Sequence, residues 1–165
     1  MPGSSVNNIQ HGGTHYKDKS VQPWDYIAAN GLGYFEGNVV KYVSRWREKG
    51  GVEDLRKARH YLDKLIELET QMLEKQIEAK VCDYAKSKGV LAYKFTSPAR
   101  AAVPDRLFIT PDGRMWFCEF KREGAKPTDA QEREHTRLRQ QKVNVFVIDN
   151  VDQGKLMIDL MVGSC

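Results

Sequence analysis

Residues 105–121 read Asp-Arg-Leu-Phe-Ile-Thr-Pro-Asp-Gly-Arg-Met-Trp-Phe-Cys-Glu-Phe-Lys, and this stretch decides the fold of the second half of the chain. Apolar runs flank Pro111-Asp112-Gly113, which is typical of a turn. The pattern therefore predicts a hairpin of two strands, over 105–109 and 114–121. Asp105 and Glu119 lie equally far from Asp112 along the chain, so they should be cross-strand neighbours with Cβ atoms about 5 Å apart.

The second predicted strand has two unlike faces, because side chains alternate along a strand. One face carries Met115, Phe117, Glu119 and Lys121, and the other carries Trp116, Cys118 and Phe120. Glu119 and Lys121 thus leave the end of an apolar strand side by side, with Asp105 opposite. Two carboxylates and a lysine at this point suit Mg2+, which binds oxygen ligands together with waters and phosphate. A surface salt bridge among Glu119, Lys121 and Arg106 is the alternative.

The segments around the hairpin alternate between the two kinds of secondary structure. Residues 90–95 have the period of a strand, 97–102 form a loop, and Pro127 and Thr128 open a helix that lasts to about Gln141. Residues 143–148 predict another strand, and a short element follows over about 151–160. With a helix ahead of the first strand, the order is α-β-β-β-α-β, which predicts a mixed sheet with flanking helices.

The first half of the chain predicts helices at about 23–29, 33–49 and from Glu53 onward. No Pro or Gly interrupts residues 52–88, so the third helix either continues for about 55 Å or breaks near 70–75. The fold class is therefore α+β, a helical module followed by a mixed-sheet α/β core. We expect a flexible leader over 1–13, a helical module over 14–72 and a second domain over 76–162.

Composition adds only weak constraints. The net charge of +4 and pI near 8.9 fit a nucleic-acid partner, although solvated charged faces explain them equally well. No apolar run approaches the roughly 18 residues of a membrane helix, so no membrane partner is expected. Cys82, Cys118 and Cys165 have no CxxC spacing, and the N-terminus lacks the features of a signal peptide. These features favour an intracellular protein.

Two short motifs carry a family resemblance. Val103-Pro104-Asp105-Arg106 and Cys118-Glu119-Phe120-Lys121 resemble the PD-(D/E)xK nuclease core, and more narrowly the virus-type replication-repair nuclease (VRR-NUC) family. That family has a helix with a glutamate, a strand, a loop ending in V-P-D, a hairpin ending in E-x-K and a helix with an early glutamine. Glu78 and Gln131 complete this order here. The loop over 97–102 departs from the family by lacking glycines, which puts substrate approach in doubt.

The resemblance implies roles for five residues. Asp105 and Glu119 would bind Mg2+ or Mn2+, Lys121 would be the catalytic lysine, and Glu78 would complete or support the metal site. Gln131 matches the family's glutamine, although it also fits position N3 of a capping box that starts at Thr128, and the two roles can coexist. Glu78 has the alternative of a solvated helix glutamate. By contrast, His135 is expected to be structural.

The resemblance also implies a substrate and a setting. The chain would be a metal-dependent DNA endonuclease that acts as a homodimer on branched or structured DNA in replication, recombination or repair. It would work in the cytoplasm of a phage-infected or prophage-bearing bacterial host. Five basic residues in or beside the predicted site loops could contact DNA phosphates, although each is also explained as an ordinary surface charge. They are Lys94, Arg100, Arg106, Arg122 and Lys126.

The first half contains His15-Tyr16, Gly-Asn-Val-Val-Lys-Tyr-Val-Ser-Arg over 37–45, Lys49-Gly50-Gly51 and Asp-Leu-Arg-Lys-Ala-Arg-His-Tyr-Leu over 54–62. Through these motifs, residues 15–69 resemble a small phage-encoded domain that also occurs in a phage nucleotide kinase without a Walker A loop. A possible nucleotide or phosphate surface there comprises His15, Asn38, Lys41, Arg45 and Lys57. Because the chain has no G-x-x-x-x-G-K-[ST] motif, a module that packs on the nuclease or mediates dimerisation is favoured over one that binds nucleotides or DNA ends. Two competing functions remain: a nucleoside monophosphate kinase with a DNA-binding second half, and a DNA-binding module without catalysis.

Overall fold

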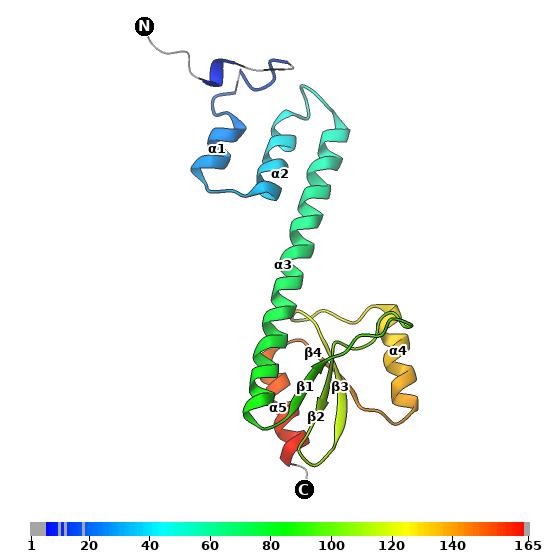
Figure 1. Cartoon of the computed structure of the whole chain (residues 1–165). Helices are drawn as coiled ribbons and strands as arrows, with labels where there is room; N and C mark the ends of the chain where they lie inside the picture. Colours follow the sequence, from blue (N-terminus) through cyan, green and yellow to red (C-terminus); the bar gives the residue numbers. More distant parts are fainter. Residues whose placement is uncertain (1–5, 10, 12, 18, 164–165) are drawn as a thin grey trace. The chain divides into compact units, whose positions relative to one another are not determined.

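The computed structural model describes residues 6–9, 11, 13–17 and 19–163. The chain divides into two compact units, Met1–Glu69 and Thr70–Cys165 (Figure 1). Much of the expected leader (residues 1–5, 10 and 12) lies outside the described residues, and η1 (Val6–Asn8) is a short 3-10 helix within it. None of the described helices is both long and apolar enough to cross a membrane.

The first unit is helical, as predicted. It contains α1 (Pro23–Ala29), α2 (Tyr34–Arg45) and the first part of α3 (Val52–Ser87). Helix α2 ends earlier than the predicted Lys49. The residues after Arg45 form turns instead, in which Lys49 N donates to Arg45 O (3.0 Å), and Gly51 takes a positive φ of 53° that diverts the chain.

Helix α3 (Val52–Ser87) is one continuous helix of 36 residues, so the possible break at residues 70–75 does not occur. The division between the two units falls within it. The helix ends where Gly89 takes a positive φ of 75° and Val90 N donates to Ala85 O at 2.9 Å. A positive φ is the usual conformation that stops a helix, and glycine adopts it without steric cost.

The second unit is built on a mixed four-stranded sheet in the order β1-β2-β3-β4. Strands β1 (Leu91–Lys94), β2 (Arg106–Ile109) and β3 (Met115–Phe120) pair antiparallel, and β4 (Val145–Ile148) pairs parallel to β3. Helix α4 (Asp129–Gln140) makes the crossover that a parallel pair requires. The α+β fold class is confirmed, and the final element is a helix, α5 (Val151–Gly163).

The hairpin register is the one predicted about Asp112. Arg106 pairs with Cys118 and Ile109 with Met115, so the next step of the same register places Asp105 opposite Glu119. Strand β4 starts two residues later than predicted. Its first predicted residue, Val143, instead closes α4 by donating its N–H to Leu138 O (3.1 Å), and Lys142 before it has a positive φ of 63°.

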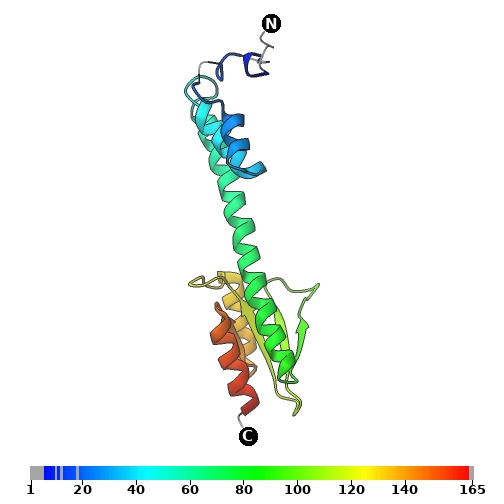
Figure 2. The same ribbon diagram turned by 90° about the vertical axis from the view of Figure 1, so that its left-hand side faces the viewer.

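Two layers of helices cover the sheet, with α3 and α5 on one face and α4 on the other (Figures 1 and 2). The hydrophobic core lies under α3 and α5 and includes the predicted apolar face of β3, namely Trp116, Cys118 and Phe120. At Gly154 of α5, an added Cβ would collide with Val81 of α3 and approach Ile148 within 3.2 Å. The absence of a side chain there lets α5 pack closely, and the opposite face of β3 is left for α4.

Candidate active site

Glu119 is the centre of the candidate site. It lies near the end of β3 on the face covered by α4, and it is 1% exposed. Its Oε1 accepts a hydrogen bond from Lys121 Nζ at 2.5 Å and another from Gln131 Nε2. Burying a carboxylate costs free energy unless hydrogen-bond donors compensate it, and here a lysine and an amide donate to the same oxygen. The fold therefore holds one oxygen of Glu119 tightly.

The other oxygen of Glu119, Oε2, is buried and has no hydrogen-bond partner among the described residues. The imidazole of His135 is close, with Nε2 3.8 Å from Oε2. Burial raises the pKa of Glu119 to about 7, the Lys121 hydrogen bond opposes this rise, and the negative charges of Asp105 and Glu74 add to it. A strongly shifted carboxyl with an unsatisfied oxygen marks a candidate functional group.

Asp105 lies immediately before β2, at the open end of the hairpin. Its Oδ2 accepts from the backbone N–H of Phe120 at 2.9 Å, and its Oδ1 lies 3.4 Å from Lys94 Nζ. The hydrogen bond to Phe120 fixes the carboxylate beside the end of β3, where Glu119 and Lys121 also lie. The structure thus brings together Asp105, Glu119, Lys121 and Gln131.

Glu78 is on α3 and reaches this region through cations. Its Oε1 accepts from Arg106 Nε at 2.6 Å and from Lys94 Nζ at 3.2 Å, and Lys94 also contacts Asp105. The carboxylate of Glu78 is therefore engaged by two positive side chains. Its contacts are with Lys94 and Arg106, and Lys94 in turn links it to Asp105.

A cleft runs between α3 and the open end of the hairpin, and it contains one carboxylate that sequence reasoning missed. Glu74 lines the cleft one helical turn before Glu78, and its Oε1 accepts from Arg122 N at 3.3 Å. The spacing of four residues between Glu74 and Glu78 was the available signal, since it puts both on one face of a helix. The lining residues are Gln71, Glu74, Lys75, Glu78, Lys94, Asp105 and Phe120.

Both placements predicted for Gln131 occur together. The side chain of Thr128 accepts from Gln131 N at 3.3 Å, and Gln131 Oε1 accepts from Thr128 N at 2.9 Å, which forms the capping box of α4. The amide nitrogen of Gln131 remains available and donates to Glu119. The cap therefore fixes the side chain that holds Glu119.

The residues present fit a hard cation, although not a complete cage. Within the described part of the chain, no group of three or more His, Cys, Asp and Glu side chains is arranged to hold a metal ion. Mg2+, however, commonly uses one or two carboxylates and takes its remaining ligands from water and phosphate. Asp105 and Glu119, with the unpartnered Oε2 of the latter, supply such a pair.

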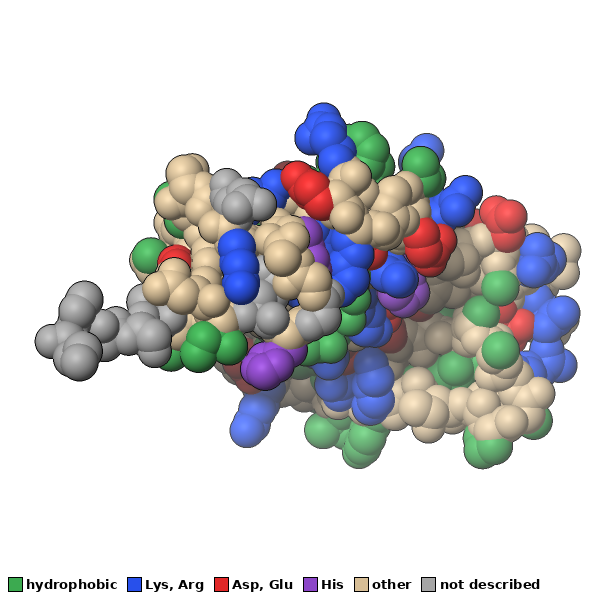
Figure 3. Space-filling view, turned by 90° about the horizontal axis from the view of Figure 1, so that it is seen from above, with side chains coloured by type: hydrophobic (Ala, Val, Ile, Leu, Met, Phe, Trp, Pro, Cys, Tyr) green, Lys and Arg blue, Asp and Glu red, His purple; other side chains and the backbone are tan. Residues whose placement is uncertain are grey.

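The five basic residues predicted to contact DNA differ in how free they are. Lys94 and Arg106 pair with Glu78, and Arg100 lies 3.6 Å from Glu134. Arg122 and Lys126 are exposed on the segment after β3. Both Lys and Arg side chains and Asp and Glu side chains are exposed on the face shown in Figure 3.

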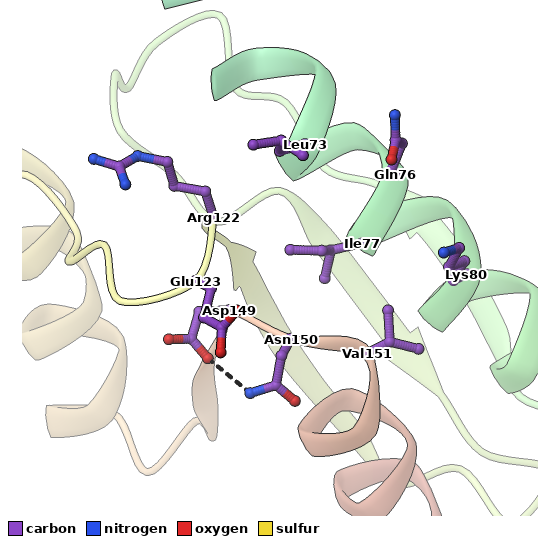
Figure 4. A pocket seen from close by; sticks show the side chains of 9 residues that line it. All are labelled: Leu73, Gln76, Ile77, Lys80, Arg122, Glu123, Asp149, Asn150 and Val151. Carbon is purple, nitrogen blue, oxygen red and sulfur yellow. Dashed lines mark hydrogen bonds between the residues drawn. The ribbon is translucent and has the colours of Figure 1, made fainter. Parts of the chain in front are cut away.

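A separate pocket lies where α3, the segment after β3 and the segment after β4 converge (Figure 4). Asn150 donates to Asp149 Oδ1 at 3.1 Å on one wall. The pocket contains none of the five predicted catalytic residues, and it shares only Arg122 with the predicted DNA contacts. Its lining consists of Leu73, Gln76, Ile77, Lys80, Arg122, Glu123, Asp149, Asn150 and Val151.

In the first unit, three of the five predicted surface residues gather around one ring. Lys41, Arg45 and Lys57 lie 5.3, 4.7 and 5.8 Å from the centroid of Tyr42. Asn38 instead donates to Tyr34 O in its own helix. The positive charge of Arg45 also lowers the pKa of His15, after the larger effects of burial and Lys49.

Both halves of the chain are similar to known proteins. A family described as a protein of unknown function (DUF3310) matches residues 10–63. A protein of Acyrthosiphon pisum secondary endosymbiont phage 1, named "Putative nuclease p44", is 42% identical over 84 residues, which are 51% of this chain and 90% of that protein. A solved "VRR_NUC domain" is 34% identical with a TM-score of 0.50, and the match covers 52% of this chain and 94% of that one.

Fold and similarity together define a nuclease. The chain belongs to the VRR-NUC family through its second half. The match over residues 10–63 assigns no activity to the first half, so its resemblance to a nucleotide-kinase module stays a prediction.

Proposed function

We propose that the second unit is a divalent-metal-dependent DNA endonuclease, with Asp105 and Glu119 holding Mg2+ or Mn2+. The observation that carries the proposal is the buried Glu119, whose Oε2 has no partner in the described residues while Oε1 is held by Lys121 and Gln131. A buried unsatisfied carboxylate oxygen is rare in folded proteins, because its desolvation is not offset. A bound cation offsets that cost.

The residues divide the chemistry of phosphodiester hydrolysis among them. A divalent ion held by Asp105 and Glu119 would supply Lewis-acid polarisation of a phosphate and would make a bound water more acidic. Lys121 is placed by Glu119 to orient the attacking water or to stabilise charge that develops on the phosphate. Gln131 keeps Glu119 oriented, and Glu78 keeps Lys94 and Arg106 beside Asp105.

The substrate and setting are proposed from the family resemblance. The protein acts as a homodimer on branched or structured DNA, in the cytoplasm of a phage-infected or prophage-bearing bacterium, in replication, recombination or repair. The phage origin of the 42% identical relative supports the setting. Arg122 and Lys126, exposed after β3, are the best-placed phosphate contacts, whereas Lys94, Arg100 and Arg106 also have acidic partners.

The decisive experiment incubates the purified chain with linear, nicked, flap and four-way DNA, with and without Mg2+ or Mn2+. We expect cleavage that needs the metal and prefers a branched substrate, and the Asp105→Ala variant should not cleave. Salt-dependent DNA binding without cleavage would instead support a non-catalytic module. Phosphoryl transfer to a nucleoside monophosphate with no DNA cut would favour the kinase alternative.

For the first unit, the proposed role is binding of a phosphate-bearing ligand. The gathering of Lys41, Arg45 and Lys57 around Tyr42 supports it. His15 lies close to this group, since its ring centroid is 4.2 Å from that of Tyr16, whose hydroxyl accepts from Arg45 Nη1 at 3.3 Å. Isothermal titration with a nucleoside monophosphate tests the role, and Lys41→Ala should weaken any binding.

A further inference from the structure

Helix α4 presents two side chains to Glu119, one for each carboxylate oxygen. Gln131 and His135 are four residues apart and so lie on the same face of the helix. The amide of Gln131 donates to Oε1, and the imidazole Nε2 of His135 lies 3.8 Å from Oε2. The sequence had suggested only a structural role for His135.

His135 is poorly explained as a core side chain. It is fully buried, and neither ring nitrogen has a hydrogen-bond partner among the described residues. Buried polar atoms are nearly always paired, so a nitrogen and an oxygen that face each other without partners need an explanation. A closer approach of less than about 1 Å would bring them to the length of an N–H···O bond.

Counting lone pairs shows what such a bond would do. A carboxylate can accept about four hydrogen bonds, two at each oxygen. Lys121 and Gln131 take both positions on Oε1, so a cation held by Glu119 must use Oε2. A hydrogen-bond donor at one lone pair of Oε2 would orient the other lone pair toward a bound cation.

We propose that His135 is a positioning residue that donates from Nε2 to Oε2 of Glu119 and orients this oxygen for the metal ion. The proposal rests on the proposed metal-dependent function. Partners that orient a ligating group in this way change metal affinity or activity by about 10–100-fold when they are removed.

The test uses the full chain and three substitutions of His135. His135→Gln keeps an amide N–H near the position of Nε2, whereas the side chain of His135→Asn is too short to reach that position. His135→Leu removes the donor and keeps a similar volume. Mn2+ affinity is measured by isothermal titration without DNA. We expect His135→Leu and His135→Asn to bind about 10–100-fold more weakly than the wild type, and His135→Gln to stay within a few-fold.

The control is Glu134→Gln on the same helix, because buried Glu134 pairs with Arg137 and Arg100 rather than with Glu119. Its Mn2+ affinity should equal that of the wild type. Equal affinity for wild type, His135→Leu and His135→Asn would overturn the positioning role while leaving the nuclease proposal intact. If His135→Leu fails to fold, the contrast between the Gln and Asn variants still decides.

A second readout does not depend on the metal. In 15N NMR of the imidazole, a wild-type His135 that faces Glu119 should carry its proton on Nε2, and Glu119→Gln should shift that nitrogen. An unchanged resonance contradicts the pairing whether or not the protein binds Mn2+. Failure of the wild type to bind metal or to cut DNA, by contrast, would remove the proposed function itself.

Discussion

Asp54 in the first unit and Glu119 in the second are both almost fully buried beside a cation, and they differ in how completely the carboxylate is satisfied. In the first unit, Asp54 is 1% exposed, with Arg45 Nε 3.0 Å from Oδ2 and Nη2 3.5 Å from Oδ1. In the second unit, Glu119 is equally buried, but only Oε1 is paired. Equal burial is therefore compensated at both oxygens of Asp54 but at only one oxygen of Glu119.

The pKa values of the two carboxyls move in opposite directions. The hydrogen bond from Arg45 lowers the pKa of Asp54, whereas burial raises that of Glu119 to about 7 despite Lys121. A carboxylate whose partners outweigh its desolvation is a structural ion pair. When desolvation outweighs the partners, the ionised form of the carboxyl is destabilised, and a nearby cation would stabilise it.

The sharpest way to break this comparison is Glu119→Gln. If Glu119 holds the metal, the variant should cleave DNA about 10³-fold more slowly or worse, because a bound ion contributes several kcal/mol to the transition state. Cleavage of the preferred DNA under single-turnover conditions measures the loss. Glu134→Gln on α4 is the matched control and should cleave normally. A Glu119→Gln enzyme that keeps a tenth of its rate would show that Glu119 is structural, like Asp54.

The converse change is Asp54→Asn, which should act on stability. It leaves Arg45, whose side chain is only 12% exposed, without its ionic partner, and such losses cost about 3–5 kcal/mol. Urea unfolding followed by a probe in the first unit measures the change. Glu53→Gln is the control, because Glu53 pairs with Arg56 in solvent and should cost less than about 1 kcal/mol. Similar costs for both variants would contradict the assignment.

The dependence of stability on pH should separate the two carboxyls. The folded-state pKa of Glu119, about 7, lies above its ordinary value of 4.5, so folding takes up a proton. Its contribution to stability is full below about pH 4.5 and is lost as the pH rises through 7, by about 3 kcal/mol in total. Asp54 has a lowered pKa, so its contribution is lost instead as the pH falls.

Thermal unfolding in EDTA between pH 5 and pH 8 checks this prediction. The wild type should lose more stability over this range than Glu119→Gln, whose side chain does not titrate. Adding Mn2+ at pH 8 should restore the wild type and leave the variant unchanged. Parallel curves for the two proteins would mean that Glu119 is already ionised at pH 5.

Local pattern was enough to predict the framework of the second unit. The turn at Pro111-Asp112-Gly113 predicts the hairpin register, and alternation predicts which residues of β3 share a face, but only the packing shows which face enters the core. The ends of elements were less predictable, because they depend on backbone hydrogen bonds such as that from Val143 to Leu138, which no periodicity reveals. For the same reason, α2 ended before Lys49.

The site was predictable only where residues lie on one hairpin or match a motif. Asp105, Glu119 and Lys121 meet because of strand register, which sequence spacing encodes. The contact of Glu78 with Lys94 and Arg106 depends on how α3 packs on the sheet, as does the approach of Glu74 to Arg122. From the sequence, His135 was expected to be structural. Its position beneath Glu119 depends on how α4 packs on the sheet, which a single histidine on a helix does not indicate.

The smallest effect separates the two roles of Gln131. Thr128→Ala removes the capping hydroxyl, which also lies 3.2 Å from Gln131 Oε1, but it keeps the backbone N–H of Thr128 that donates to this oxygen. It should therefore destabilise the second unit by about 1 kcal/mol and slow cleavage far less than loss of Gln131. Gln131→Ala removes half of the capping box and also the donor to Oε1 of Glu119, so it should have a similar cost in stability and a loss of cleavage of about 10–100-fold. Thermal unfolding and cleavage rates, measured on both variants, make the comparison. If the two variants cleave equally fast, Gln131 only caps the helix, and Oε1 of Glu119 is held by Lys121.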